Sequence, residues 1–570
     1  MKYSRWPVLA FASVAAVFFH GCFRREEVPG IVEEARTVPG RPDTVAVLRF
    51  MPESAAIAIA IPSIESVNTD LESFLIRGAP DHINMEAEIK VVVRQLARNA
   101  EAFDAQTVED IALAKGIDPG APLGVFFPAE DEYLDSDTAA QRPFPGTDMG
   151  PFSVLPGSMS SFVTPLLAFS SRFAVVLPVI NRQDAEQLVS DWGGGGTMNP
   201  NDVSDLGTTI FTRTDGHFAY FFTKLWLVAG TDPMLVNEIA GRMTAPAVIR
   251  YGTDECPADA NDEMVLLIRL DRLTASYQGR GESAGSGWYS PLVGPLAAAY
   301  TGDDPIVVTW KFDEDHLTVR SRLDYDRHPR ALELAGQPRP LALPGRFPAS
   351  TLAFSSFSLG DEYRAHLKTA LTGPEQSQSA LAPVAPSLTK LIDAMGNEIA
   401  MAVTGMEGGS LKLALLARFN DGDAARAALD EMGMLALKDQ TYNNTDLYAF
   451  FFPMPLMDQI RYAIPGNTFV VATDLNLLRT LVDSILSEKN SGLMAALEPP
   501  LDESAPRRNL LVARKEFFSD AFVPLLASTG MISAEQREIV AHMFDKLRDA
   551  RLTTEVHNNW MDNRLVVQLD

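Results

Sequence analysis

The apolar positions of this chain form short runs that recur in the same order in its two halves. Met264–Leu273 reads MVLLIRLDRL and Asn509–Phe518 reads NLLVARKEFF, and each run becomes charged at its far end. Short apolar runs with polar boundaries are typical of buried β-strands. The two runs begin about 245 residues apart, which suggests that one structural element occurs twice.

The segments around these two runs also match between the halves. The matched pairs are Met51–Ser63 with Phe347–Ser358, Gly120–Phe127 with Gly396–Gly405, Phe173–Gly193 with Lys412–Gly433, Leu225–Met243 with Thr468–Leu486, and Ile306–Leu323 with Ala550–Leu569. The last pair alternates apolar and polar residues around a polar turn, as a half-buried hairpin does. Several elements that recur in one order indicate an internal duplication.

One matched pair predicts a strand, a turn and the start of a helix in each half. Asn181 and Asn420 mark the turns, and Asp184 and Asp423 follow three residues later. Side-chain oxygens at these positions accept hydrogen bonds from the free backbone N–H groups of a first helical turn. An acidic group there also suits the helix dipole. We therefore interpret Asp184 and Asp423 as structural, helix-capping residues.

A second pair of aspartates follows another predicted strand. Asp232 and Asp474 each come after an apolar run that ends in threonine, and an amphipathic helix is predicted to begin there. Recurrence of these acids in both halves fits a shared folding requirement as well as a shared function. We interpret Asp232 and Asp474 as helix-capping residues as well.

Each half is predicted to be an α+β domain, with a mostly antiparallel sheet and helices packed on one face. The order strand, helix, strand, strand, helix, strand, helix, hairpin lacks the regular alternation of a parallel α/β fold. The first domain is expected at 44–325, with a loop insertion near 128–170 that is rich in proline, serine, glycine and acids. A linker at 326–340 leads to the second domain at 341–570.

The N-terminus predicts export. Lys2 and Arg5 precede an apolar run that ends at Gly21–Cys22, and this run is shorter than the roughly 20 residues of a spanning helix. The pattern is similar to a bacterial lipoprotein signal, so residues 1–21 are expected to be removed and Cys22 lipidated. An uncleaved anchor or another cleavage site are the alternatives. Residues 22–43 are predicted to form a flexible tether.

The residue after the cysteine bears on the destination. In Gram-negative lipoproteins, which this signal resembles, aspartate at that position is associated with the inner membrane, whereas this chain has Phe23. The resemblance implies the periplasmic side of the outer membrane, with the lipid anchor as the contact to the membrane.

Charge and cysteine content exclude some functions. The chain has a formal charge of −26 and a pI near 4.7, so its surface repels phosphate backbones and nucleic acid is not an expected partner. The two cysteines, Cys22 and Cys256, do not provide a disulfide framework or a cysteine-rich zinc site.

The clearest catalytic motif is GESAG at 281–285, which fits the G-x-S-x-G pattern of serine hydrolases with Ser283 as nucleophile. His316 with Asp313 or Asp315 would have to complete a triad. However, the surrounding residues predict a flexible loop and not a strand-turn-helix elbow. No metal site and no cofactor site is indicated, and the protein is predicted not to be an enzyme.

A long apolar stretch stands apart from the regular strands. AFFFPMPLM contains two prolines, which are unusual in a central strand. Phe450, Phe451, Phe452 and Met454 are therefore candidates for an apolar contact surface. The alternative is a buried edge segment.

Three segments resemble a loose family of uncharacterised bacterial envelope proteins: GIDPGAPLGVFF (116–127), FAVVLPVINRQDAEQLV (173–189) and LVAGTD (227–232). Members of this family carry a domain of unknown function, often duplicated, behind a lipoprotein signal. The resemblance covers roughly Thr44 to Asp570, although the second half lacks the GIDP motif. It implies an exported protein of two similar lobes without established catalytic residues.

These observations favour a lipid-anchored envelope protein that acts as a non-enzymatic binding or structural module. Its partner would be another protein or an apolar ligand. One alternative is a periplasmic carrier or chaperone for an apolar ligand, and another is a serine hydrolase that uses Ser283.

Overall fold

The computed structural model describes two compact units. The described residues are 47–79, 84–128, 172–192, 196–203, 208–244, 264–269, 306–324, 338–372, 385–407, 410–431, 436–450, 460–487, 493–497, 500–502, 504, 506–528, 537, 541, 544, 546–557 and 560–570. Of these, residues 47–269 and 306–319 belong to unit 1, and residues 320–570 belong to unit 2.

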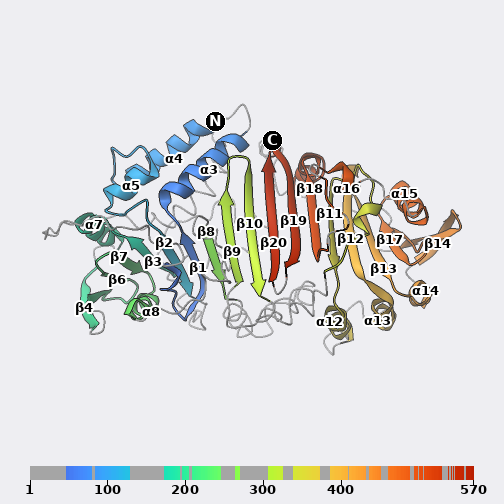
Figure 1. Cartoon of the computed structure of the whole chain (residues 1–570), viewed down its shortest axis with the longest axis horizontal. Helices are drawn as coiled ribbons and strands as arrows, with labels where there is room; N and C mark the ends of the chain where they lie inside the picture. Colours follow the sequence, from blue (N-terminus) through green and yellow to red (C-terminus); the bar gives the residue numbers. More distant parts are fainter. Residues whose placement is uncertain are drawn as a thin grey trace. The chain divides into compact units, whose positions relative to one another are not determined.

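Unit 1 contains ten strands, the last of which continues past the boundary, and several helices among its described residues (Figure 1). The strands are β1 (Ala55–Ile61), β2 (Leu123–Pro128), β3 (Ala174–Pro178), β4 (Met198–Val203), β5 (Thr208–Arg213), β6 (Ala219–Phe222), β7 (Trp226–Gly230), β8 (Met264–Ile268), β9 (Ile306–Phe312) and β10 (His316–Asp324). The helices are α3 (Ile64–Gly78), α4 (Met85–Asn99), α5 (Val108–Ala114), α7 (Arg182–Trp192) and α8 (Pro233–Thr244).

Unit 2 has a similar set of elements. Its strands are β11 (Ala353–Ser358), β12 (Met395–Glu407), β13 (Ser410–Phe419), β14 (Ala436–Tyr442), β15 (Thr445–Phe450), β16 (Arg461–Ala463), β17 (Thr468–Ala472), β18 (Asn509–Arg514), β19 (Leu547–His557) and β20 (Trp560–Leu569). Its helices include α12 (Asp361–Thr372), α13 (Ala385–Ala394), α14 (Gly422–Glu431), α15 (Leu475–Leu486), α16 (Leu493–Ala496), α17 (Lys515–Phe517) and α18 (Val523–Ser528).

The strands of the two units are hydrogen-bonded in the same order. In unit 1 the order is β4-β5-β6-β7-β3-β2-β1-β8-β9-β10, and in unit 2 it is β14-β15-β16-β17-β13-β12-β11-β18-β19-β20. The strand pairs with a defined register are antiparallel. The prediction of a mixed α+β fold built on antiparallel sheet is therefore confirmed.

The cross-strand register at the centre of each unit also agrees. Ala58 of β1 lies between Phe126 of β2 and Leu267 of β8. Phe354 of β11 lies between Ala402 of β12 and Val512 of β18. Ala58, Phe126 and Leu267 thus correspond to Phe354, Ala402 and Val512. The matched sequence segments pair the same positions.

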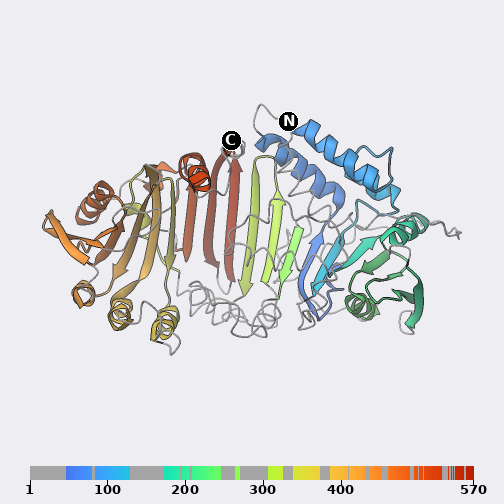
Figure 2. The same cartoon turned by 180° about the vertical axis from the view of Figure 1, so that it is seen from behind.

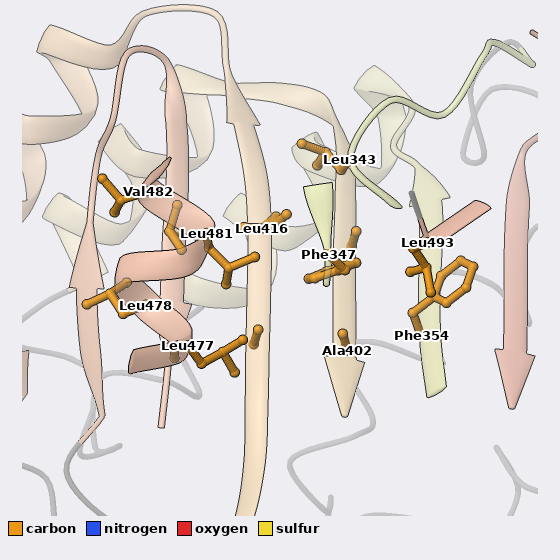
Figure 3. Close-up of a cluster of buried hydrophobic side chains, with 14 of the residues drawn as sticks. Leu343, Phe347, Phe354, Ala402, Leu416, Leu477, Leu478, Leu481, Val482 and Leu493 are labelled. Carbon is orange, nitrogen blue, oxygen red and sulfur yellow. The ribbon is translucent and has the colours of Figure 1, made fainter. Parts of the chain in front are cut away.

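Helices α8 and α15 have equal lengths and bury the same helical positions. The buried residues of α8 are Leu235, Val236, Ile239 and Ala240, and those of α15 are Leu477, Leu478, Leu481 and Val482. Spacings of one, three and four residues place such side chains in one stripe of a helix. Figure 3 shows the stripe of α15 beside Leu416 of β13, within one buried cluster of unit 2.

The prediction that helices pack on one face of each sheet was wrong, because helices cover both faces. In unit 1, Val176 packs in a cluster with Leu235 of α8, whereas the adjacent Val175 packs with Leu188 of α7. Successive strand residues point to opposite faces, so α7 and α8 lie on opposite sides (Figure 1, Figure 2). Helices α14 and α15 do the same in unit 2. Both faces of β3 are buried, which explains its continuous apolar sequence.

In the described part of the chain, no helix combines the length and apolar character needed to cross a bilayer. The prolines and acids of the predicted loop insertion between 129 and 170, and most of the predicted linker at 326–340, lie outside the described residues.

Candidate functional site

Asp232 and Asp474 lie at helix starts and bind backbone N–H groups. The Asp474 carboxylate accepts a hydrogen bond from the Leu477 N–H at 2.7 Å. The Asp232 carboxylate accepts one from the Met234 N–H at 3.0 Å and forms an ion pair with Arg172 at 2.6 Å. These contacts provide acceptors for free backbone N–H groups in the first turns of α15 and α8.

Asp184 and Asp423 are not the capping residues, which corrects the sequence interpretation. Asn181 Oδ1 accepts a backbone N–H of the first turn of α7 at 3.0 Å. Asp421 Oδ1 accepts two from the first turn of α14, at 3.0 and 2.9 Å. Asp184 and Asp423 lie inside those turns. The sequence comparison matched Asn181 with Asn420, whereas the strand register places Asn181 in the position of Asp421.

Gly116, the first residue of the GIDP motif, has a structural role. This motif is part of the sequence that resembles the envelope-protein family. Gly116 has a φ of +73°, and a Cβ there would lie 2.1 Å from the Asn181 carbonyl oxygen. The Gly116 carbonyl accepts hydrogen bonds from the Ile180 and Asn181 N–H groups at 2.9 and 3.1 Å. Gly116 therefore allows a close approach between the α5–β2 loop and the start of α7.

Of the residues proposed for a serine-hydrolase triad, the structure describes the histidine and the two aspartates. Ser283 lies outside the described residues. His316 Nδ1 lies 2.7 Å from Asp315 Oδ1, and His316 Nε2 lies 3.1 Å from Asp313 Oδ2. In a catalytic triad, one ring nitrogen faces the nucleophile. Here both nitrogens face carboxylates of the β9–β10 turn.

The remaining sequence-predicted residues lie mostly outside the described parts. Cys22, Phe451, Phe452 and Met454 belong to this group, and Phe450 is described only as the last residue of β15. Within the ranges given above, no three His, Cys, Asp or Glu side chains gather closely enough to hold a metal ion.

A row of mostly apolar side chains crosses one face of unit 2, where sequence analysis had predicted no site. Directly opposed residues of neighbouring strands share a face. The row, which we call the apolar row, consists of Leu415 (β13), Met401 (β12), Ser355 (β11), Leu511 (β18), Leu552 (β19) and Leu565 (β20).

The apolar row is open to solvent at its centre. Met401 is 46% exposed and Leu511 is 37% exposed, although their strands flank the interior strand β11. The two adjacent rows contain no charged side chain; they are Val403, Ala353, Ala513, Ala550 and Val567 on one side and Ile399, Phe357, Asn509, Thr554 and Asn563 on the other. An uncharged, partly exposed sheet face of this kind is typical of an interaction surface.

Part of the same row is covered in unit 1. Its members there are Val175, Val125, Ile59, Leu266 and Val308. Val125 corresponds to Met401 but is only 2% exposed. It belongs to a cluster that includes Ala112 of α5 and Leu188 of α7. Helices of the chain therefore cover the β2 and β3 positions of this row in unit 1, whereas Met401, the equivalent of Val125, is exposed in unit 2.

Followed beyond β3 and β13, the register of each row leads through β7 or β17 to a stacked aromatic pair on β5 and β6 or on β15 and β16. Phe211 stacks on Tyr220 at a centroid distance of 5.0 Å, and Tyr448 stacks on Tyr462 at 5.0 Å. Burial raises the pKa of Tyr220 and of Tyr462, so both hydroxyls stay neutral. Sequence analysis missed these pairs, although aromatic residues at matched strand positions were the available signal.

Comparison with known proteins assigns no family. No protein-family model matches the sequence, and no curated protein matches it. The chain is similar to a solved structure described as "Structure of crystal form III of TP0453", with 10% identity over 39% of this chain and 91% of that chain. The TM-score is 0.25, so this likeness carries no argument about fold or function.

Proposed function

We propose that this protein is an exported, lipid-anchored bacterial envelope protein that acts as a non-enzymatic binding module. Its binding surface is the apolar row of unit 2. The observation that carries the proposal is the exposure of Met401 and Leu511 within three neighbouring cross-strand rows of β11, β12, β18, β19 and β20 that contain no charged side chain. Fully burying a Leu or Met side chain contributes about 1.5–3 kcal/mol, so a few such residues support specific binding.

Internal duplication is the second part of the proposal. One ancestral α+β fold was duplicated to give the two units. The shared strand order, the matched partners of Ala58 and Phe354, and the equivalent stripes of α8 and α15 support this origin. After duplication, one copy kept a helical cover over part of its row, and the other copy presents its row to a partner.

Export and anchoring rest on the N-terminal sequence. The basic start, the apolar run and Cys22 support lipidation after removal of residues 1–21. The tether at 22–43 then holds both units outside the cytoplasm, and the periplasmic side of the outer membrane is the proposed location.

Site-specific photo-crosslinking tests the binding function. A benzophenone amino acid replaces Met401 in the full chain, produced in Gram-negative cells, and the matched control carries it at Met234 of α8. Met234 is a suitable control because it is 68% exposed and lies in unit 1. We expect an adduct from position 401 and none from position 234. No adduct from position 401, or equal adducts from both positions, would contradict the proposal.

The mass of the adduct separates the binding partners. A protein adduct supports a protein-binding module, whereas a lipid adduct supports the carrier alternative. Labelling of Ser283 by a fluorophosphonate probe would contradict the non-enzymatic part of the proposal.

A further inference from the structure

We infer that the occupant of the apolar row is an amphipathic helix of a partner protein, with basic residues beside its apolar stripe. This inference rests on the proposed function and specifies the partner of that same surface.

Unit 1 shows what this sheet face accepts. The β2 and β3 part of its equivalent row lies under helices, with Ala112 of α5 and Leu188 of α7 in the same buried cluster as Val125. At the neighbouring strand β9, Phe74 of α3 packs edge-on against Phe312 at a centroid distance of 5.8 Å. Amphipathic helices are therefore the elements that cover this face in this fold.

The described helices of unit 2 leave the centre of the row open. Helix α13 contacts α12 and α14, and its Leu391 packs with Phe419 and Leu429. This position covers the β13–β17 side of the face, while Met401 and Leu511 stay exposed. Six strands at a spacing of about 4.8 Å make the row about 24 Å wide, which exceeds the diameter of about 10–12 Å of one helix.

The charge around the apolar row favours a basic helix over a second copy of the chain or an anionic lipid. The apolar row and its two adjacent rows are uncharged, so the charged residues in the rest of unit 2 govern the approach of a partner. Unit 2, which carries the row, comprises residues 284–302 and 320–570 and contains 31 Asp and Glu against 25 Lys and Arg, so it is itself acidic, with a formal charge of −6 out of −26 for the whole chain. An acidic surface attracts a basic partner and repels a second copy of the same chain or an anionic lipid.

Binding of designed peptides tests the inference. The full chain is reconstituted in phosphatidylcholine nanodiscs, and empty nanodiscs serve as the blank. The probe is a fluorescent amphipathic peptide of about 18 leucines and lysines, long enough for five helical turns. The comparison peptides are a leucine–glutamate peptide of the same pattern and a leucine–lysine peptide of scrambled order.

Two double variants test the location. The row variant is Met401→Glu with Leu511→Glu, and the matched control is Met234→Glu with Leu437→Glu, two apolar residues that are 68% and 58% exposed elsewhere. We expect the row variant to bind the amphipathic leucine–lysine peptide about tenfold more weakly or worse, and the control variant to bind it like the wild type. Both comparison peptides are expected to bind the wild type about tenfold more weakly.

Several results would overturn the inference. The first is that the row variant and the wild type bind the leucine–lysine peptide equally. The second is that either comparison peptide binds the wild type as tightly as the amphipathic leucine–lysine peptide does. The third is that the wild type sediments as a dimer and the row variant as a monomer. If the row variant loses its wild-type thermal transition, Met401→Gln replaces it, because glutamine has a similar length. If position 401 crosslinks to a protein but the peptides do not bind, the proposed binding function stands and the inference that the partner contributes an amphipathic helix is wrong.

Discussion

Tyr448 stacks on Tyr462 across neighbouring strands, with ring centroids 5.0 Å apart and ring planes 11° from parallel. Phe211 and Tyr220 form the equivalent pair in unit 1, at 5.0 Å and 15°. Tyr462 is only 2% exposed and also contacts Phe469, so the pair belongs to the core beneath α14.

Removal of the Tyr462 ring is expected to destabilise unit 2. Tyr462→Ala should lower the free energy of unfolding by about 3–5 kcal/mol, because it leaves a large cavity in a buried cluster. Tyr462→Leu keeps much of the apolar volume and should lose the smaller contribution of aromatic packing, about 0.5–1.5 kcal/mol beyond the area lost. Urea unfolding monitored by circular dichroism measures both. Equal unfolding of Tyr462→Ala and the wild type would contradict this role.

Capping variants distinguish the observed caps from the residues first expected to cap. Asp474→Ala and Asp421→Ala should each destabilise the protein by about 1 kcal/mol, because each leaves N–H groups of a first turn without an acceptor. Asp423→Ala should cost less than about 0.5 kcal/mol, because its exposed carboxylate only pairs with Arg426. Thermal unfolding of the three variants provides the comparison. A loss at Asp423 as large as that at Asp421 would restore the original interpretation.

Glu398 predicts a pH dependence of stability. This carboxylate is 3% exposed, accepts a hydrogen bond from the Leu343 N–H at 2.8 Å, and has a pKa that burial raises above 4.5. The folded state therefore holds the proton more tightly than the unfolded state. The resulting stabilisation is present below pH 4.5 and is lost as pH rises through the raised pKa.

Glu398→Gln removes this titration while it keeps an oxygen acceptor. Between pH 4.5 and neutral pH, the stability of the wild type relative to Glu398→Gln should decrease as pH rises. Chemical unfolding at a series of pH values measures the difference. A difference that does not change with pH, or that grows in favour of the wild type, would show that Glu398 does not titrate in this way.

Anchoring predicts covalent lipid on Cys22. Radiolabelled palmitate should be incorporated into the wild type and lost in Cys22→Ala, because Cys22 provides the thiol of the proposed signal. Cys256→Ala is the matched control and should keep the label. Unchanged labelling of Cys22→Ala would exclude lipidation at this residue.

The sequence carried enough local information to predict the main elements. Asp232 and Asp474 stand at helix starts because the capping oxygen and the helix that needs it are close neighbours in the chain. The hairpins β9–β10 and β19–β20 were predictable for the same reason. The one-residue error at Asn420 arose because a matching residue type does not fix strand register.

The apolar row was not predictable from the sequence. Met401 lies in a continuous apolar stretch that resembles a strand buried on both faces, as Val125 does. Whether such a residue is covered depends on helices that are remote in the chain, such as α7 over β2 and β3. Periodicity reports which residues avoid water, but it does not report which of them the fold leaves uncovered.

Oxidative footprinting of Met401 tests the central claim most directly. Hydroxyl radicals are generated around the purified full chain and around intact envelopes that contain it, and oxidation of Met401 and Met234 is measured by mass spectrometry. Both methionines are exposed in the isolated chain, at 46% and 68%, so both should oxidise readily in the purified protein. In the envelope, the account predicts that Met401 becomes protected while Met234 does not. Equal oxidation of Met401 in the two preparations would contradict the claim that the apolar row binds a partner.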